Sequence, residues 1–370
     1  MEYFQPRFRF LFVLLALGNG CGQDTVAFEP GLVEGDNAII GGTQATDADY
    51  PAVGALLMSF KLPPSRQLQG NMICTGTLIA PDVFLVAAHC IDEDSIVGSG
   101  ITINWHVSFS VDVSDFGVVT LDLPADTYEV AGTLKHPLFD PTGITSYGLG
   151  RGHDVGLVFL KTPVSDRTPA VVLGPNDADQ IVVDTPAKIV GYGIRDPDYD
   201  PQSAAPMDGG IKYLATSVIN EVGDTEMQIG TQPPTPQKCI GDSGGPTFLE
   251  YHDGLLPIER VVGVTSRAYD ASNCHRGGID TRVDAYRSWI DIEMANACAT
   301  QIRTACQGEV GLALPAPEPA PADEPSSDGG CSATARRSGH TAALVVTLAF
   351  LLRRGLGGRR RQPSSEPRRH

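Results

Sequence analysis

The body of this chain consists of many short runs of strand-forming residues. Between residues 39 and 292, runs rich in Val, Ile, Leu and Thr alternate with clusters of Gly, Pro, Asp and Asn, and only Ala285–Ala297 has helical spacing. Because strands and helices do not alternate regularly, the pattern indicates an all-β barrel or sandwich rather than a doubly wound parallel sheet. The expected strands cover residues 52–60, 77–86, 118–123, 155–160, 187–190 and 260–265.

Acidic residues dominate this body. The 370-residue chain has 44 Asp and Glu against 27 Lys and Arg, and residues 332–370 hold nine of the arginines. A nucleic-acid-binding protein needs a basic face that displaces counterions from phosphates, so the acidic body argues against nucleic acid as a partner. Gly191-Tyr192-Gly193 lacks the third glycine and the helix of a dinucleotide site, and we interpret it as a turn.

The N-terminal segment has the layout of an export signal. Arg7 and Arg9 precede an apolar run over residues 10–17, and small residues follow as far as Cys21. A cysteine in this position is similar to the lipid-attachment box of bacterial lipoproteins, although Gly18 stands where that box usually has a Leu-like residue. We therefore assign residues 1–21 to a signal peptide and keep both lipid attachment at Cys21 and ordinary cleavage nearby as interpretations.

The C-terminal segment differs in composition from the body. Residues 314–328 are rich in Pro, Ala and acidic side chains, which is typical of a solvated linker, and we assign 299–330 to a disulfide loop and linker. Cys331 precedes an 11-residue apolar run at 342–352, which is shorter than the roughly 20 residues that span a bilayer, and an arginine cluster. Residues 331–370 resemble the sorting tags of myxobacterial exported proteins, and a marginal membrane anchor is the alternative.

Three segments of the body carry the chemistry. The string Gly-Asp-Ser-Gly-Gly-Pro at 241–246 places Ser243 between glycines, where the backbone can turn sharply and present two N–H groups to an oxyanion. A serine hydroxyl needs a base, and an imidazole base needs a carboxylate that fixes its tautomer. His89 follows an expected strand and Asp154 opens another, where a carboxylate that enters the interior needs a partner.

Together these segments resemble the trypsin/chymotrypsin family of serine endopeptidases. Supporting strings are Ile-Ile-Gly-Gly at 39–42, Cys-Thr-Gly-Thr-Leu-Ile at 74–79 and Thr-Arg-Val at 281–283. The resemblance covers about residues 39–292 and implies two packed antiparallel six-stranded β-barrels, a C-terminal helix and a catalytic cleft between the barrels. It implies a propeptide at 22–38 and a protease domain at 39–298.

The resemblance also implies a role for each matched residue. Ser243 is expected to be the nucleophile, His89 the general base and then acid, and Asp154 the carboxylate that orients His89. The backbone N–H groups of Gly241 and Ser243 would form the oxyanion hole. Neither a metal nor a cofactor takes part in this mechanism.

A zymogen is a further implication of the resemblance. Cleavage before Ile39 would free an ammonium group that pairs with buried Asp242 and orders the oxyanion backbone. The residues before the cut are Asn37 and Ala38, with no Lys or Arg, so the expected activator is a protease that cleaves after Ala38.

The expected specificity pocket departs from the family pattern. Gln237 lies six residues before Ser243, where trypsin-type enzymes have Asp, so this position does not support a preference for Arg or Lys. Asp280 stands near a usual family Tyr and would restore a negative floor unless Lys238 neutralises it, and Arg267 replaces a usual aromatic residue. The other expected pocket residues are Ala268, Gly278 and Ser266, and Ser266 matches a family serine that lies beside the buried Asp.

Six of the eight cysteines lie in the body or just after it. The family match assigns the pairs Cys74–Cys90 and Cys239–Cys274, and Cys298 and Cys306 are expected to close a local loop. Three disulfides fit an oxidising compartment. A zinc site is the competing idea, and it is weak because no two cysteines have the short spacing of zinc ligands.

The sequence therefore predicts an exported serine endopeptidase that hydrolyses polypeptides through an acyl-enzyme. It would be secreted or held at the bacterial cell surface, with membrane attachment through the terminal tags as one option. The alternative is a binding or regulatory protein on the same fold without catalysis, although such proteins usually lack one of the three catalytic residues. An α/β-hydrolase esterase would need the order Ser, Asp, His, which is the reverse of the order here.

Overall fold

The computed structural model of this chain describes residues 39–62, 67–96, 101–145, 147–196, 209–231, 234–252, 257–270 and 273–306. The expected signal peptide, propeptide, Pro-rich linker and C-terminal tag, with Cys21 and Cys331, lie outside these residues. Among the described residues, no helix combines the length and the apolar character needed to cross a lipid bilayer.

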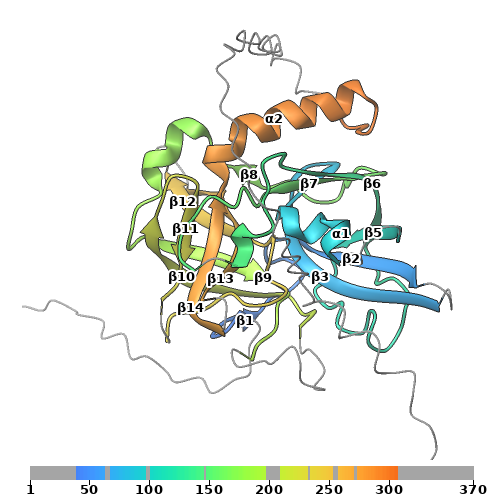
Figure 1. Cartoon of the computed structure of the whole chain (residues 1–370), viewed down its shortest axis with the longest axis horizontal. Helices are drawn as coiled ribbons and strands as arrows, with labels where there is room; N and C mark the ends of the chain where they lie inside the picture. The colour runs from blue at the N-terminus through green and yellow to red at the C-terminus, as the bar shows by residue number, and fades with distance from the viewer. Residues whose placement is uncertain are drawn as a thin grey trace, which may run out of the picture. The chain divides into compact units, whose positions relative to one another are not determined.

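The first half of the described chain forms a closed six-stranded barrel (Figure 1). In order around the barrel, its strands are β2 (Val53–Leu62), β3 (Gln67–Ala80), β4 (Val83–Val86), β7 (Gly156–Leu160), β6 (Thr127–Lys135) and β5 (Ile103–Ser108). β5 pairs with β2 and closes the ring, and every neighbouring pair is antiparallel. A closed ring leaves no unpaired strand edge.

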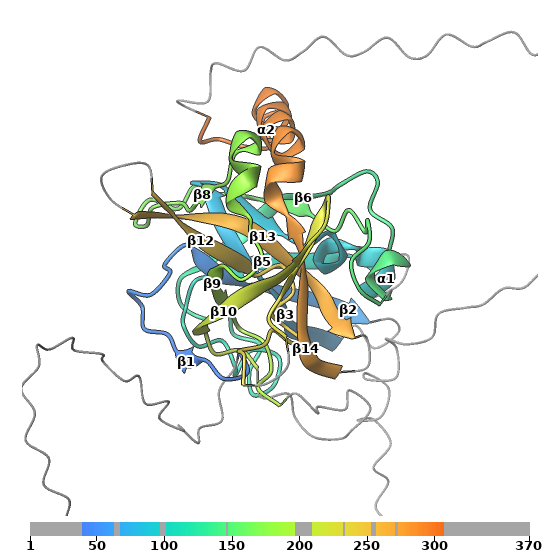
Figure 2. The same ribbon diagram turned by 90° about the vertical axis from the view of Figure 1, so that its left-hand side faces the viewer.

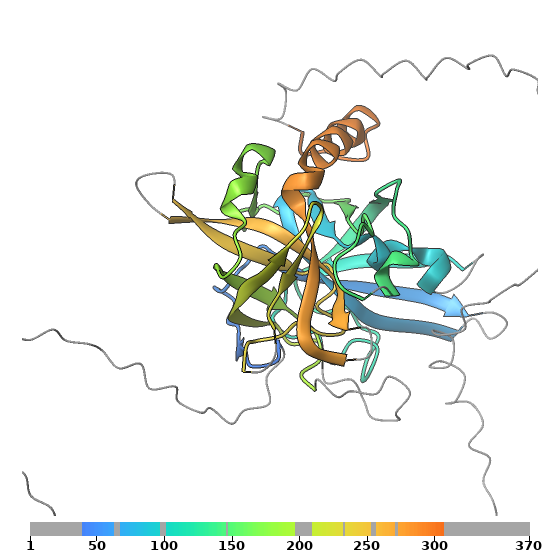
Figure 3. The same cartoon turned by 60° about the vertical axis from the view of Figure 1, so that its left-hand side comes forward.

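The second half forms another ring of six antiparallel strands, drawn in olive to orange beside the blue to teal strands of the first barrel in Figure 3. In order, its strands are β9 (Pro186–Gly191), β10 (Tyr213–Val222), β11 (Glu226–Ile229), β14 (Asn273–Arg282), β13 (Pro257–Asp270) and β12 (Pro246–His252). β12 pairs with β9 again and closes the ring. β1 (Thr43–Gln44) is added beside β10, and β8 (Val171–Val172) runs parallel to β13.

Alternating apolar residues of both barrels merge into one hydrophobic core. Leu56, Phe84 and Leu157 of the first barrel and Ile229 and Val262 of the second are fully buried members of it. Burying one side chain of this size contributes about 1.5–3 kcal/mol relative to leaving it in water. The shared core holds the two barrels, and hence the residues between them, in one arrangement.

In the described ranges, helices are few and lie outside the barrels. α2 (Val283–Ala299) follows β14 and packs on β8, β13 and the 3₁₀ segment η3 (Pro175–Gln180), drawn in green beside it in Figures 1 and 2. The remaining short turns of helix are η1 (Ala88–Ile91), α1 (Glu93–Ile96) and η2 (Gly143–Thr145). The two-barrel fold with a C-terminal helix confirms the fold expected from the sequence.

Two strand predictions need correction. Residues 118–123 form no strand, because the N–H groups of Val118 and Val119 both bond to the carbonyl of Asp115 in a tight turn, and Val119 is 76% exposed. The expected strand at 77–86 is the end of β3 and all of β4, separated by a turn at Pro81-Asp82. Apolar β-branched residues are thus not sufficient for a strand when no partner edge is available.

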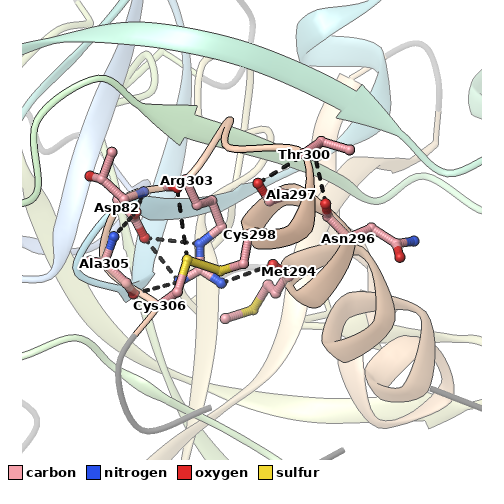
Figure 4. The surroundings of a disulfide bond; sticks show 10 residues. Asp82, Met294, Asn296, Ala297, Cys298, Thr300, Arg303, Ala305 and Cys306 are labelled. Atoms are coloured by element: carbon pink, nitrogen blue, oxygen red, sulfur yellow. Dashed lines mark hydrogen bonds and ion pairs between the residues drawn. A yellow bond between two sulfur atoms is a disulfide. The ribbon is translucent and has the colours of Figure 1, made fainter. Parts of the chain in front are cut away.

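A C-terminal clasp, formed by Asp82 and residues 298–306, joins the end of α2 to the first barrel (Figure 4). The disulfide Cys298–Cys306 closes the loop after α2. Asp82 in the β3–β4 turn is fully buried, and its carboxylate accepts a 2.9 Å hydrogen bond from Nε of Arg303 and bonds from the backbone N–H groups of residues 304 and 305. The clasp therefore compensates a buried carboxylate with a buried guanidinium and two backbone donors.

Candidate active site

His89, which follows β4, and Asp154, which precedes β7, contact each other through two hydrogen bonds. β4 leads directly into η1, which carries His89, and Asp154 lies two residues before β7 begins. Nδ1 of His89 is 2.7 Å from Oδ2 of Asp154, and the backbone N–H of His89 donates to Oδ1 at 2.9 Å. Both carboxylate oxygens therefore help to fix the position of the imidazole, and a bond at Nδ1 leaves Nε2 as the atom that can accept a proton.

The second barrel also contacts Asp154. Oγ of Ser266, on β13, donates a 2.7 Å hydrogen bond to Oδ2 of Asp154, and Oγ1 of Thr281, on β14, donates to its backbone carbonyl at 2.9 Å. Asp154 is fully buried. The carboxylate is thus bound from both barrels, which holds it at their interface.

The two groups shift each other's pKa in opposite directions. Burial by itself would lower the pKa of His89, but the charge of Asp154 and its hydrogen bond outweigh burial, and the net shift is upward. Burial would raise the pKa of Asp154, but the attraction of His89 and the hydrogen bonds from His89 and Ser266 lower it overall. Asp154 therefore stays ionised and stabilises a protonated His89.

The loop that carries Ser243 is anchored to both barrels. Gly241 and Gly244 have φ values of +93° and +80°, a region in which a side chain is strained, and a Cβ on Gly244 would lie 2.3 Å from the carbonyl oxygen of Thr75. The carbonyl of Ser243 accepts the N–H of Thr75 on β3 at 2.8 Å, and the N–H of Gly244 donates to Thr265 on β13 at 2.7 Å. Glycine at position 244 is thus required for the close approach of the loop to β3.

The loop presents backbone N–H groups beside Ser243. Among the described residues, the N–H groups of Gly241 and Ser243 have no acceptor, whereas those of Asp242, Gly244 and Gly245 each donate to a carbonyl. Unpaired donors next to a serine hydroxyl can bind an oxyanion.

Ser243 and His89 are not hydrogen-bonded to each other in this structure. Within the described part of the chain, Nε2 of His89 has Sγ of Cys90 as its neighbour at 3.8 Å, and no bond to Oγ of Ser243 is formed. Contacts between a nucleophile and its base are often loose without substrate and tighten in the substrate complex. The structure thus joins two of the three expected catalytic side chains directly and brings the third into the same region through its loop.

Asp242 points away from Ser243 into the protein. It is fully buried, and its carboxylate accepts the N–H groups of Gly193 at 2.8 Å and Cys239 at 2.9 Å. Burial raises the pKa of Asp242 to about 6, although these two backbone hydrogen bonds act in the opposite direction. Ile39 is also fully buried, and Ile40 exchanges two 3.0 Å backbone hydrogen bonds with Gln237. The segment that begins at Ile39 therefore lies along the segment that leads to Asp242.

A cavity of about 280 Å³ opens beside Ser243. Its walls are mainly apolar and include Ile144, Ile240, Ala268 and the Cys239–Cys274 disulfide. A concave apolar site next to a candidate nucleophile is the expected place for a substrate side chain.

Comparison with known proteins agrees with this geometry. The Trypsin family model matches residues 39–290. This chain belongs to the trypsin family. Serine protease 56 of Mus musculus is 27% identical over an alignment of 274 positions that covers 71% of this chain and 40% of that protein. Trypsin of Saccharopolyspora erythraea is 26% identical, over 70% of this chain and 100% of that protein. The chain thus spans less than half the length of the first relative and the whole of the second.

The expected pocket residues occupy different environments in this trypsin-family chain. Ala268 lines the cavity, and Ser266 donates a hydrogen bond to the buried Asp154, which is where its match to a family serine leads us to expect it. Gln237 is buried and does not line the cavity. Its amide nitrogen donates to the carbonyl of Thr235, and its Oε1 has no hydrogen-bond partner among the described residues. Gly278 and Asp280 lie on β14, where they contact Lys238 rather than the cavity.

Sequence reasoning missed Glu226. Arg267, which replaces the usual aromatic residue, forms a two-point ion pair with Glu226 on β11 at 2.9 and 2.8 Å. The same carboxylate accepts the N–H groups of Gly150 and Gly152, in the loop that leads to Asp154. A buried arginine needs a carboxylate partner, and that requirement is the signal by which Glu226 could have been sought.

The described cysteines form three disulfides. Cys74–Cys90 joins β3 to η1 next to His89, Cys239–Cys274 borders the cavity, and Cys298–Cys306 belongs to the clasp. Cys74, His89 and Cys90 are the one group of described residues close enough to hold a metal ion. Both sulfurs of that group are in a disulfide, so they are not thiolate ligands.

Proposed function

We propose that this chain is an exported serine endopeptidase that hydrolyses peptide bonds in polypeptide substrates. The observation that carries the proposal is the contact of His89 with Asp154, next to a serine whose flanking N–H groups have no acceptor in the described structure. Membership of the trypsin family supports this assignment. No cofactor is needed, because the side chains supply both the nucleophile and the proton transfer.

In the acylation step, Oγ of Ser243 attacks the carbonyl carbon of the substrate while Nε2 of His89 takes the hydroxyl proton. Asp154 supports the resulting imidazolium through its hydrogen bond to Nδ1. The oxyanion forms beside the N–H groups of Gly241 and Ser243, and this kind of donor is worth about 3–4 kcal/mol of transition-state stabilisation. The carbon–nitrogen bond then breaks, and the leaving amine takes the proton from His89.

In the deacylation step, water enters where the amine has left. His89 takes one proton from the water as the oxygen attacks the ester carbonyl, and the same two N–H groups bind the second oxyanion. The bond to Oγ of Ser243 then breaks, Oγ regains its proton from His89, and the carboxylic acid product leaves.

We also propose activation by cleavage between Ala38 and Ile39. Full burial of Ile39 and the backbone pairing of Ile40 with Gln237 support an insertion of the new N-terminus beside Asp242. An ammonium group at Ile39 would neutralise a carboxylate that has only backbone donors among the described residues. The activator would be a protease that accepts small residues, because Asn37 and Ala38 precede the cut.

Export is proposed from the terminal segments. Residues 1–21 would serve as the signal peptide, 22–38 as the propeptide and 331–370 as a sorting tag or anchor after the linker. The protein would be secreted or attached to the bacterial cell surface, through lipid on Cys21 or through the C-terminal tag. Three disulfides support an oxidising compartment.

A binding protein on the same fold is the second candidate. The missing hydrogen bond between Ser243 and His89 is the observation that favours it. The two functions differ in whether Ser243 is reactive, which a covalent probe can measure.

The test uses the full chain, treated with an immobilised elastase-type protease that cleaves after small residues and is then removed. Edman sequencing should find Ile39 as the new N-terminus, and a fluorophosphonate should label the cleaved protein but not the uncleaved protein. Ser243→Ala should abolish labelling. A correctly cleaved, folded wild type that is not labelled would establish the binding protein instead.

A further inference from the structure

Lys238 is the most deeply buried residue that lines the cavity beside Ser243, so it forms the base of this cavity, and it belongs to a buried ion pair. Nζ of Lys238 lies 2.9 and 2.8 Å from the two carboxylate oxygens of Asp280 and 2.7 Å from Oγ1 of Thr247. Lys238 is 2% exposed, and Asp280 and Thr247 are 0% exposed. An ammonium group has three N–H donors, so these three acceptors satisfy all of them.

Lys238 separates the cavity from Asp280. Lys238 lines the cavity, whereas Asp280, on β14, does not. A Cβ on Gly278 would lie 3.4 Å from Cβ and 3.7 Å from Cδ of Lys238, so the methylene stem of the lysine passes close to that glycine. A substrate side chain in the cavity would therefore contact Lys238, and the charge of Lys238 is already compensated by Asp280.

We propose that the Lys238–Asp280 pair makes the base of this pocket electrically neutral and directs cleavage to bonds that follow medium-sized, uncharged apolar residues. This inference rests on the proposed peptidase function and adds the substrate class to it. The apolar walls at Ile144, Ile240 and Ala268 suit such a side chain. Among the described residues that line the cavity there is no carboxylate, and the two cations, Lys238 and Arg267, are already paired with Asp280 and Glu226. A charged substrate side chain would therefore be desolvated there without compensation.

The same pair predicts how the preference can be changed. Lys238→Ala removes the ammonium and its stem, which opens the cavity to an unpaired Asp280, and a substrate Lys or Arg can then supply the missing positive charge. Asp280→Asn leaves the Lys238 ammonium without a counter-charge, and a substrate Glu can supply it. The double variant has neither charge, so it keeps the preference for uncharged residues and serves as the matched control.

The experiment measures kcat/KM of the activated full chain for peptides that differ only in the residue before the cut, which is Leu, Lys or Glu. For the wild type, Leu should exceed both charged residues by at least about 100-fold. Lys238→Ala should raise the ratio of Lys to Leu by about 100-fold, and Asp280→Asn should raise the ratio of Glu to Leu by a similar factor. The double variant should raise neither ratio.

Fluorophosphonate labelling of each protein separates this proposal from the proposed function. A labelled wild type that prefers Lys or Glu overturns the neutral pocket and leaves the peptidase function intact, whereas an unlabelled wild type overturns the function itself. A labelled Lys238→Ala variant with an unchanged Lys to Leu ratio also overturns the pocket proposal. If Lys238→Ala does not fold, the proposal is tested by the kcat/KM values of the wild type for the three peptides and by the Glu to Leu ratio of Asp280→Asn.

Discussion

Arg267 on β13 and Glu226 on β11 form a buried, two-point ion pair, with side chains 5% and 1% exposed. The guanidinium also donates to the carbonyl of Gly148 at 2.9 Å, and the carboxylate accepts the N–H groups of Gly150 and Gly152. The pair therefore holds the loop that precedes Asp154, and in this chain it occupies the place of the family's usual aromatic side chain.

Glu226→Gln should destabilise the protein by about 3–5 kcal/mol, because it leaves the Arg267 guanidinium buried without a counter-charge. Urea unfolding of both proteins measures this difference. Adding Arg267→Met should recover much of the loss, since the Gln carbonyl still accepts the N–H groups of the loop. Asp224→Asn, which breaks an exposed pair with Arg151 nearby, is the control and should have no measurable effect. An equal loss in both single variants would contradict this account.

The activity of the cleaved protein should fall as the pH is lowered through the pKa of His89, because only the neutral imidazole accepts the serine proton. Asp154 holds that pKa above 6.5, so the acid limb of kcat/KM should have its midpoint above 6.5. Asp154→Asn removes the charge, which should move the midpoint to lower pH and reduce kcat by on the order of 10⁴. Ser266→Ala keeps the charge and should retain most of the upward shift. An acid limb that does not move in Asp154→Asn would show that Asp154 does not act through His89.

Asp242 should make the uncleaved protein less stable as the pH rises. The pKa of Asp242 is about 6 in the folded protein, against an ordinary value of 3.8, so the folded state binds the proton more tightly than the unfolded state does. The free energy of unfolding should therefore fall by about 3 kcal/mol as the pH rises from 4 to 6. Asp242→Asn should remove this slope, and cleavage before Ile39 should remove it in the wild type, because the ammonium favours the charged carboxylate. The free energy of unfolding from pH 4 to 7 measures each case. The same slope before and after cleavage would argue against the ion pair.

The clasp should depend more on Arg303 than on its disulfide. Arg303→Met leaves Asp82 buried with only backbone donors, at an expected cost of about 3–5 kcal/mol. Replacing both Cys298 and Cys306 with Ala reopens a loop with a sequence separation of 8, for which chain entropy predicts about 2.5 kcal/mol. Thermal unfolding of the two variants shows which one loses more stability. Arg303→Lys keeps the charge, so its stability should lie between that of the wild type and that of Arg303→Met. A larger loss in the disulfide variant would reverse our ranking.

Short local patterns were sufficient to predict an all-β chain and several of its strands, whereas the two-barrel arrangement was predicted from the family resemblance. Runs of apolar residues marked β2, β7, β9 and β13, and a helical pattern marked α2. β14 was not among the strands predicted from apolar runs, because its residues Asn273–Arg282 include few apolar side chains and its position depends on pairing with β11 and β13. Residues 118–123 show the opposite error. The apolar run predicted a strand, but no strand edge among the described residues lies beside it, and its residues form a turn.

The glycine-flanked serine, the histidine after a buried strand and the aspartate before another are visible in the sequence because backbone geometry and burial require those residue types locally. The charge partners are not visible in this way. Arg267 and Glu226 are 41 residues apart, Lys238 and Asp280 are 42 apart, and Asp82 and Arg303 are 221 apart. A buried charge demands a counter-charge, but closure of the barrels selects which of the many acidic residues supplies it. In this chain, closure of the second barrel places Lys238 at the base of the pocket, with Asp280 on β14 as its counter-charge and Thr247 on β12 as a further hydrogen-bond partner. The charge of the pocket therefore depends on how β12 and β14 pack around Lys238.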